Sequence, residues 1–193
     1  MSAPSLLTEL QAVNSILSLI GEAPLNTLQN VTSLDALNAV AALRRAQREI
    51  LTSGFWFNKE VVTITATAGG KFQVPDTFLW VDPVDRNERH FVQRGEYLYN
   101  LKDNTFTGNT GTIELEACVS LDWDELPQTA RQAIQASAAK HFAFSEVGEQ
   151  NLYQVAMANE RFAMAELYNE NLLHERTTRL EGPALRGAVP RWR

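Results

Sequence analysis

Close to the N-terminus, apolar residues recur every three or four positions, which is the period of one face of an α-helix. Gly21 follows this stretch and Pro24 comes shortly after it, and together they are a typical signal for the end of a helix. The pattern therefore predicts an amphipathic helix that ends near residue 20. Its apolar positions are Leu6, Leu10, Val13, Ile16, Leu17 and Ile20.

A second helix is predicted to begin near residues 32–35, where Thr32 and Asp35 form a T-x-x-D cap pattern. We expect this helix to end at Gly54, because glycine is the usual residue just past a helix C-terminus. Its apolar positions are Leu37, Val40, Leu43 and Ile50. Its charged face consists of Arg44, Arg45, Arg48 and Glu49.

After the aromatic run at residues 55–57, the period of the apolar residues changes to two. Apolar residues alternate with threonines over residues 62–67, and Gly69 and Gly70 then turn the chain into residues 72–74, which predicts a β-hairpin. Further strands are predicted at residues 78–81, 90–93, 97–101 and 112–119. In the last of these, one face carries Ile113, Leu115, Ala117 and Val119. Five or six short strands predict a small antiparallel sandwich or barrel.

Helix is predicted to return near Asp122, because acidic residues followed by Pro127 are favoured in a first helical turn. This segment should run to about Glu146, break at Gly148 and resume until about Glu175. The predicted fold class is α+β, with an antiparallel-type bundle of about four helices, an inserted small antiparallel β-sandwich or barrel, and an extended C-terminal arm. The predicted boundaries are 1–57 and 122–175 for the two halves of the bundle, 58–121 for the β domain and 176–193 for the arm.

The composition is that of an ordinary folded protein, with 193 residues of which 45% are hydrophobic. No apolar run approaches the roughly 20 residues that cross a bilayer. The N-terminus lacks the basic region and cleavage site of a signal peptide. We therefore expect a soluble, unprocessed protein that contacts no membrane. The single cysteine, Cys118, cannot form an internal disulfide and suits a protein made in a reducing cytoplasm.

The formal net charge of −6 is unevenly divided along the chain. Residues 176–193 hold five arginines and one acid, Glu181, which gives +4. The first 175 residues hold the other 12 basic and 22 acidic residues, which gives −10. An acidic body argues against a tight grip on nucleic acid, because that grip comes from Lys and Arg replacing counterions on phosphates. It is compatible with a protein that surrounds DNA without holding it.

The basic stretch at residues 176–193 also carries two prolines and two glycines, so it is predicted to be an extended arm. One interpretation is a solvated chain end, as most termini are. The other is an arm that orders on a partner, with Leu185, Val189 and Trp192 as apolar anchors and the arginines meeting carboxylates.

The sequence contains few residues in patterns that carry chemistry. The three histidines (His90, His141 and His174) lie far apart, and there is no P-loop and no nucleophile elbow. Metal, phosphate-loop and nucleophilic enzymes are therefore disfavoured, and we expect no catalytic residue, metal or cofactor. His141 is expected on a helix packing face. The aromatic run at residues 55–57 is interpreted as core where helix passes into sheet, with a stacking platform for bases or sugars as the alternative.

Carboxylates are the remaining chemical resource. Glu114 and Glu116 share one face of a predicted strand, and Asp122 and Asp124 cluster at a helix start. A pair of carboxylates roughly 5 to 10 Å apart can cleave glycosidic bonds. Capping and solvation are the simpler roles for acids in these positions.

Specific strings in this order resemble the tail tubular protein A family, the head-to-tail adaptors of short-tailed bacteriophages. AVNSILSLIGEAPLNTL (residues 12–28) fits the N-terminal A-V-N-x-I-L-x-x-I-G-E-x-P signature of that family. SGFWFN (residues 53–58) lies at the family's helix-to-strand joint. QRGEYLY (residues 93–99) fits its R-G-x-Y-x-Y hairpin and DELP (residues 124–127) its D-E-x-P helix start. The signature residues, which we interpret as structural, are Asn14, Gly21, Glu22, Pro24, Trp56, Gly95, Tyr97, Tyr99 and Pro127.

The resemblance implies a non-enzymatic virion connector. It implies a homo-oligomeric ring, of 12 subunits on the portal, that joins the portal protein to the tail nozzle (tail tubular protein B) and continues the channel for DNA ejection. Tail fibres are a further expected partner, and DNA passes through without specific binding. The protein is expected in the virion tail at the head-to-tail interface, after synthesis in the host cytoplasm. The portal-binding arm comprises Arg176, Arg179, Leu185, Arg186, Val189, Arg191, Trp192 and Arg193.

Two alternatives to a purely structural adaptor remain open on the sequence. One is an adaptor that also hydrolyses glycans through Glu114, Glu116, Asp122 or Asp124. The other is a free DNA-binding protein, which the acidic body disfavours.

Overall fold

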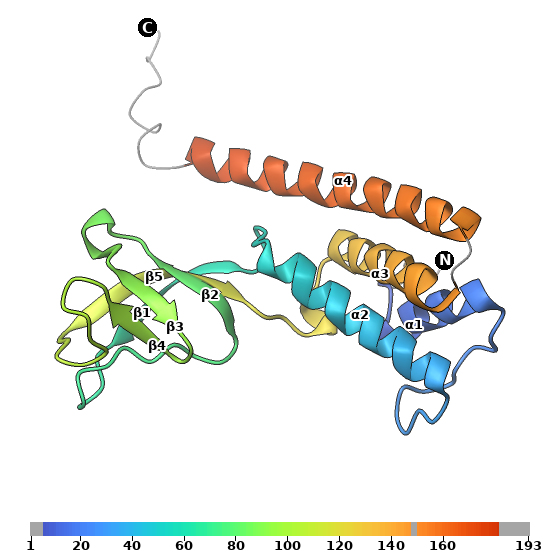
Figure 1. The fold of residues 1–193 in the computed structure, drawn as a ribbon. Helices are drawn as coiled ribbons and strands as arrows, with labels where there is room; N and C mark the ends of the chain where they lie inside the picture. Colours follow the sequence, from blue (N-terminus) through green and yellow to red (C-terminus); the bar gives the residue numbers. More distant parts are fainter. Residues whose placement is uncertain (1–5, 148–149, 182–193) are drawn as a thin grey trace, which may run out of the picture. The chain divides into compact units, whose positions relative to one another are not determined.

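The computed structural model describes residues 6–147 and 150–181 and confirms the predicted α+β class, with four helices and small antiparallel sheets (Figure 1). The described residues form two units. One unit is helical and contains the chain up to Gln47 and again from Leu126. The other spans Arg48–Glu125 and contains all the strands.

The described residues contain four α-helices, α1 (Glu9–Leu17), α2 (Leu34–Thr52), α3 (Gln128–Phe142) and α4 (Gln150–Glu181). The first helix ends as predicted, because a 3₁₀ turn at Ser18–Ile20 leads into Gly21, whose φ is 75°. The predicted helix from Asp122 begins later, since a 3₁₀ turn at Trp123–Glu125 precedes α3. A π-helical turn at Ala143–Val147 separates α3 from α4, near the predicted break.

The last helix is longer than the sequence pattern predicts. α4 continues to Glu181 rather than ending near residue 175, so residues 176–181 are helical where the extended arm was expected to begin. Residues 176–180 (RTTRL) contain neither proline nor glycine, and the first helix-breaking pair is Gly182-Pro183. The predicted start of the arm was placed where the sequence becomes basic. The helix instead continues through these residues because their backbone propensities permit it.

Within the helical unit, α3 packs antiparallel to α4. Lys140 forms an ion pair with Glu160 at 2.6 Å near the end of α3, and the Thr129 hydroxyl donates to Glu170 at 2.6 Å near its start. The buried Arg131 joins α3 to the N-terminus, because its Nη1 donates to the Leu7 carbonyl at 2.9 Å. These contacts place α3 at the centre of the unit, with α1 and α4 against different parts of its surface.

The strands form two antiparallel sheets that share one core. A three-stranded sheet has the order β1 (Lys59–Thr65), β5 (Thr112–Val119), β2 (Phe78–Pro83). A two-stranded sheet pairs β3 (Phe91–Arg94) with β4 (Tyr97–Asn100). The buried core residues are Phe72, Val74, Val81, Leu98, Ile113, Leu115 and Ala117. The predicted core face of β5 is therefore confirmed for Ile113, Leu115 and Ala117, whereas Val119 is half-buried.

The predicted hairpin around Gly69 and Gly70 is wrong in its pairing. β1 pairs along its whole length with β5, from Lys59 opposite Cys118 to Thr65 opposite Thr112. After the glycine turn, residues 72–74 run beside β4, where Phe72 O accepts from Leu98 N at 3.0 Å. Phe72 and Val74 are 3% exposed in the core, so burial of these two side chains draws the segment across to β4.

Asn58 joins the last turn of α2 to the first and last strands of the second unit. Its Nδ2 donates to the carbonyls of Leu51 at 2.9 Å and Val119 at 3.1 Å, and its Oδ1 accepts from Phe55 N at 2.8 Å. The residue is 2% exposed. One side chain therefore satisfies buried backbone groups of three separate segments.

Substituting Asn58 by alanine should lower the free energy of unfolding by about 3 kcal/mol, because three buried backbone groups lose their partner. Chemical denaturation followed by circular dichroism measures this change. Asn26→Ala, at an exposed position of the loop before α2, is the matched control and should stay within about 0.5 kcal/mol of wild type. Equal stabilities for the two variants would contradict the role assigned to Asn58.

Candidate functional site

The N-terminal signature residues hold the loop after α1 in place. The Asn14 side chain donates to the Leu25 carbonyl at 2.9 Å and accepts from the Leu25 amide at 2.7 Å. Gly21 has the left-handed backbone that ends the 3₁₀ turn, and no atom lies within 4 Å of the position its Cβ would take. Glu22 and Pro24 are exposed on the same loop. The contacts of Asn14 and the backbone of Gly21 therefore fix the conformation of this loop.

The aromatic run lies at the start of the second unit and contributes to packing. Phe55 is 1% exposed and stacks on Phe57 with ring centroids 5.8 Å apart. Trp56 is half-buried and meets Phe57 edge to face at 4.9 Å. Phe55 therefore belongs to the core, and the three rings do not form one open platform.

The signature string at residues 93–99 lies in the hairpin formed by β3 and β4. Gly95 has φ of 64° in the turn between the two strands, and Arg94 lies opposite Tyr97 in the pairing. The Arg94 guanidinium lies 3.8 Å from the centre of the Tyr99 ring, and the Lys71 ammonium lies 4.9 Å from that of Tyr97. Both tyrosines are thus held by cations of neighbouring segments.

Pro127 is the residue that precedes the first turn of α3. Its ψ of 157° is extended, and its carbonyl accepts the Arg131 amide at 3.1 Å. Just before it, Glu125 accepts the backbone amide of Asp122 at 3.0 Å, which is a capping contact. The D-E-x-P string therefore sets the beginning of α3.

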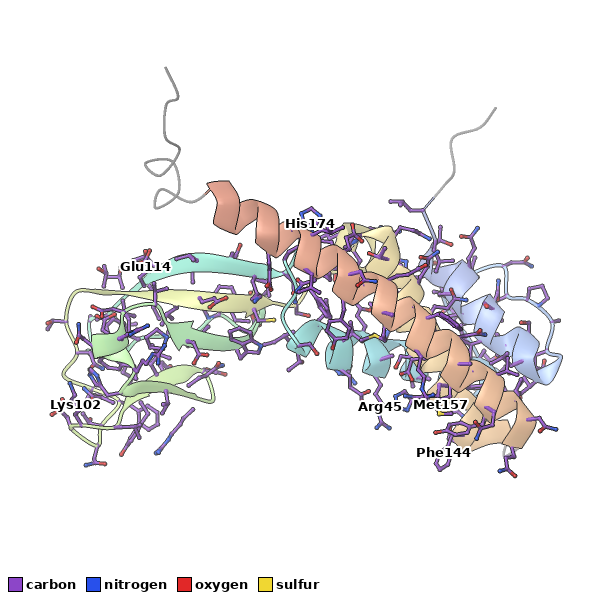
Figure 2. The ribbon with its side chains drawn as sticks, turned by 90° about the horizontal axis from the view of Figure 1, so that it is seen from above. Arg45, Lys102, Glu114, Phe144, Met157 and His174 are labelled. Atoms are coloured by element: carbon purple, nitrogen blue, oxygen red, sulfur yellow. The ribbon has the colours of Figure 1, made fainter. Side chains whose placement is uncertain are left out.

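The candidate carboxylates lie on exposed or half-buried positions of the second unit. Glu114 is exposed on the outer face of β5 (Figure 2), and Glu116 lies 3.7 Å from the Lys59 ammonium. Asp122 and Asp124 are exposed beside the 3₁₀ turn. Within the described residues, none of the four lies in a closed cavity, and Glu116 is the one of them with a salt bridge.

The histidines stay apart in the structure. His90 Nδ1 lies 2.9 Å from the Asn87 carbonyl in the strand unit, and His174 is exposed on α4. His141 is half-buried and borders a pocket with Asn38 and Phe144, which agrees with a packing face. Across residues 6–147 and 150–181, no group of three or more His, Cys, Asp or Glu side chains could hold a metal ion. No helix in these ranges is long and apolar enough to cross a membrane.

Large apolar side chains are exposed along α4, and the sequence analysis did not identify them. α3 has 15 residues and α4 has 32, so α3 cannot cover α4. Figure 2 shows the extent of α4, with Met157 near one end and His174 near the other. The apolar residues of α4 with roughly half or more of their surface exposed are Val155 (59%), Phe162 (74%), Tyr168 (49%), Leu172 (51%) and Leu173 (63%). The spacing of these apolar residues along the sequence was the pattern from which this surface could have been predicted.

A groove with a volume of about 370 Å³ lies in the helical unit, and Val155 and Phe162 are the two of these exposed residues that line it. Four alanines from α3 and α4 line it, and α1 contributes Ser15 while the 3₁₀ turn contributes Leu19. Leu152 and Val155 lie toward one end of the groove, and Glu166 with Gln132 lies toward the other. The alanines are Ala136, Ala139, Ala156 and Ala163. A surface of small side chains next to exposed apolar ones is suited to receiving another helix.

Two thirds of the predicted arm, residues 182–193, lie outside the described residues. The backbone of Arg176 and Arg179 belongs to the last turns of α4. The other residues proposed for the arm, Leu185, Arg186, Val189, Arg191, Trp192 and Arg193, lie beyond the part of the chain that the structure describes.

Comparison with known proteins gives two findings. A family model described as tail tubular protein matches residues 10–177 of the chain. Tail tubular protein A of Klebsiella phage KP34 is 27% identical to the chain over 169 residues, which are 87% of this chain and 89% of that protein. The family match therefore includes all five strands, α2 and α3, and most of α1 and α4.

Cys118 is buried on the second face of β5, next to Asn58. Its Sγ donates to the Leu51 carbonyl at 3.1 Å and lies 3.3 Å from Asn58 Nδ2. Burial raises the pKa of the Cys118 thiol above its ordinary value of 9.0, and the Asn58 hydrogen bond opposes this in part. The thiol is therefore protonated and inert in the folded protein.

At pH 8 the folded protein should react with a thiol reagent at least about 100-fold more slowly than the unfolded chain, because the thiol is covered and neutral. Well below pH 9 the thiol is largely neutral in both states, so it adds no pH dependence to the free energy of unfolding there. Above it the unfolded chain ionises first, so the free energy of unfolding should fall as the pH rises further. Rapid labelling of native protein would contradict the burial of Cys118. Cys118→Ala should remove this part of the pH dependence, which isolates it from other alkaline effects.

Proposed function

Because the chain belongs to the tail tubular protein family, whose members are structural proteins of phage tails, we propose that it is the adaptor that joins the head of the phage to its tail. In this proposal several copies form a ring beneath the portal protein, twelve when the portal is present. The ring is continued on its other side by the tail nozzle, tail tubular protein B, and tail fibres attach nearby.

The exposed apolar face of α4 is the observation that best supports a ring. Phe162 is 74% exposed and Val155 is 59% exposed on one face of the helix. An extended apolar surface of this kind is a cost to a free subunit and is typical of a surface that another subunit covers. A structural tail protein with such a surface is therefore expected to function as an oligomer.

The charge distribution supports a channel through which DNA moves. The first 175 residues carry −10, and a ring multiplies this charge by the number of subunits. Basic rings bind duplex DNA through its phosphates, whereas acidic rings leave it free to slide. We therefore assign to the ring the task of passing the genome during ejection, with no sequence-specific contact to it.

The C-terminal residues are proposed to bind the portal. Residues 182–193 carry three arginines, no acid, and the apolar residues Leu185, Val189 and Trp192. Arginine binds carboxylates in a bidentate manner, and Trp is prominent among residues that dominate binding energy. Because the described part of α4 extends to Glu181, the proposed portal-binding segment is taken as the residues that follow it.

Electron microscopy of the purified protein, alone and with the portal protein of the same phage, tests the adaptor proposal. We expect rings in at least one of the two samples and a complex with one ring per portal. A protein that forms neither a ring nor a portal complex in these samples is not the adaptor.

Deleting residues 182–193 should abolish portal binding and leave the thermal stability unchanged, because α4 stays whole to Glu181. The matched control replaces Arg186, Arg191 and Arg193 by glutamine and keeps the length of the chain. This control should weaken portal binding by at least about tenfold, since charge-assisted contacts are lost. Co-sedimentation with purified portal measures both. Full portal binding by the truncated protein would show that another surface makes this contact.

A further inference from the structure

A closed ring of identical subunits requires two different surfaces on each subunit, because its contacts run head to tail. The inference rests on the proposed ring and concerns the two surfaces through which neighbouring subunits bind each other. In the helical unit, the groove between α1, α3 and α4 is one candidate. The outward face of α2 is the other.

The groove changes character along its length. Val155 and Leu152 make one end apolar, and the exposed Glu166 with Gln132 makes the other end polar and acidic. Val155 and Glu166 are eleven residues apart on α4, or about 16 Å at 1.5 Å per residue. A helix that fits the groove therefore needs apolar side chains at one end of one face and a cation about 16 Å further along.

The outward face of α2 has this arrangement. Leu34 is 71% exposed and Leu37 is 48% exposed in its first turn. Arg44 is exposed on the same side, and the structure gives its guanidinium no ion pair within the described residues. From Leu34 to Arg44 is ten residues, or about 15 Å. The apolar and charged positions of α2 thus match those of the groove in order and in spacing.

The two surfaces lie on opposite sides of α3, as a head-to-tail contact requires. Figure 1 shows α3 between α2 and α4 in the helical unit. The pocket residues agree, because the groove takes Gln135 and Ala139 from one side of α3 while α2 meets His141 on another. A subunit can therefore present its α2 face to one neighbour and its groove to the next.

We infer that adjacent copies of this chain bind by placing the outward face of α2 of one copy in the α1–α3–α4 groove of the next. Leu34 and Leu37 pack against the apolar end near Val155, and Arg44 meets Glu166 at the other end. The α2 helix of the neighbour then runs parallel to α4. The alanines of the groove let the two helices approach closely.

Two variants break one surface each and leave the other intact. Leu37→Glu places a charge on the α2 face, and Ala139→Tyr fills the groove. Each should weaken ring formation on the order of 100-fold, because a buried unpaired charge or a blocked pocket disrupts the centre of the contact. Leu172→Glu is the matched control, since Leu172 is 51% exposed on α4 but does not line the groove. It should leave ring formation unchanged. Thermal unfolding confirms that all three variants fold.

Mixing the two defective proteins gives the sharpest result. Leu37→Glu retains its groove and Ala139→Tyr retains its α2 face, so the mixture should form pairs of one copy each and no rings. Charge reversal is the second arm of the test. Arg44→Glu and Glu166→Arg should each weaken assembly by about tenfold and restore it together. Native mass spectrometry measures both arms, in the condition in which the wild type forms rings.

The outcomes separate this contact from the ring itself. Rings that persist in Leu37→Glu and Ala139→Tyr would overturn the contact and leave the ring in place, and so would an equal loss in Leu172→Glu. Loss of portal or nozzle binding with intact rings would assign the groove to that partner instead. A wild type that forms no ring, with or without portal, would overturn the proposed function and this contact with it.

Discussion

The 32 residues of α4 are more than twice the 15 of the helix on which it packs, and this mismatch limits what one subunit can bury. Lys140 and Thr129 fix α4 against α3 near both ends of α3. They leave one face of α4 outward, with Phe162 and Val155 among its exposed side chains. Hydrophobic burial dominates the stability of folded proteins, so a chain that leaves this much apolar surface exposed gains from association. The proposed assembly rests on this geometry more than on any single residue.

The strand unit has a hydrophobic core of its own. Its core residues come from both sheets and from the segment that carries Phe72 and Val74. Asn58 and Cys118 close the junction with the last turn of α2 through bonds to the Leu51 carbonyl. The acids of β5 face outward, where Glu116 meets Lys59. This unit is therefore built around its own core, and its outward carboxylates lie on exposed or half-buried positions.

The sequence predicts the elements of this protein better than their pairing. The apolar period and terminal glycine of α1 and the alternation of β5 act over a few residues, and both predictions hold. The partner of residues 72–74 depends on the burial of Phe72 against a strand more than twenty residues away, which a local pattern does not encode. The end of α4 was misplaced for a related reason, since charge marks a surface whereas helix length follows backbone preferences.

The candidate surfaces were predictable in part. The signature residues Asn14, Gly21 and Pro127 have local structural roles that capping and turn rules anticipate. The groove combines side chains from α1, α3 and α4, so it emerges only when those helices are placed together. The exposure of Leu34 and Leu37 could not be predicted either, because an apolar residue in a helix is assigned to the core until its neighbours are known.

The pairing of Lys59 with Cys118 has a consequence for how such proteins change over time. The chain enters the sheets at Lys59 and leaves them at Val119, and these ends are hydrogen-bonded neighbours through Asn58. The inserted segment between these two residues therefore begins and ends at neighbouring positions. A lineage of phages can therefore lengthen, shorten or exchange the loops of this insert while the spacing of the flanking segments stays the same. The length of these loops and the structure of the flanking helices can thus change independently.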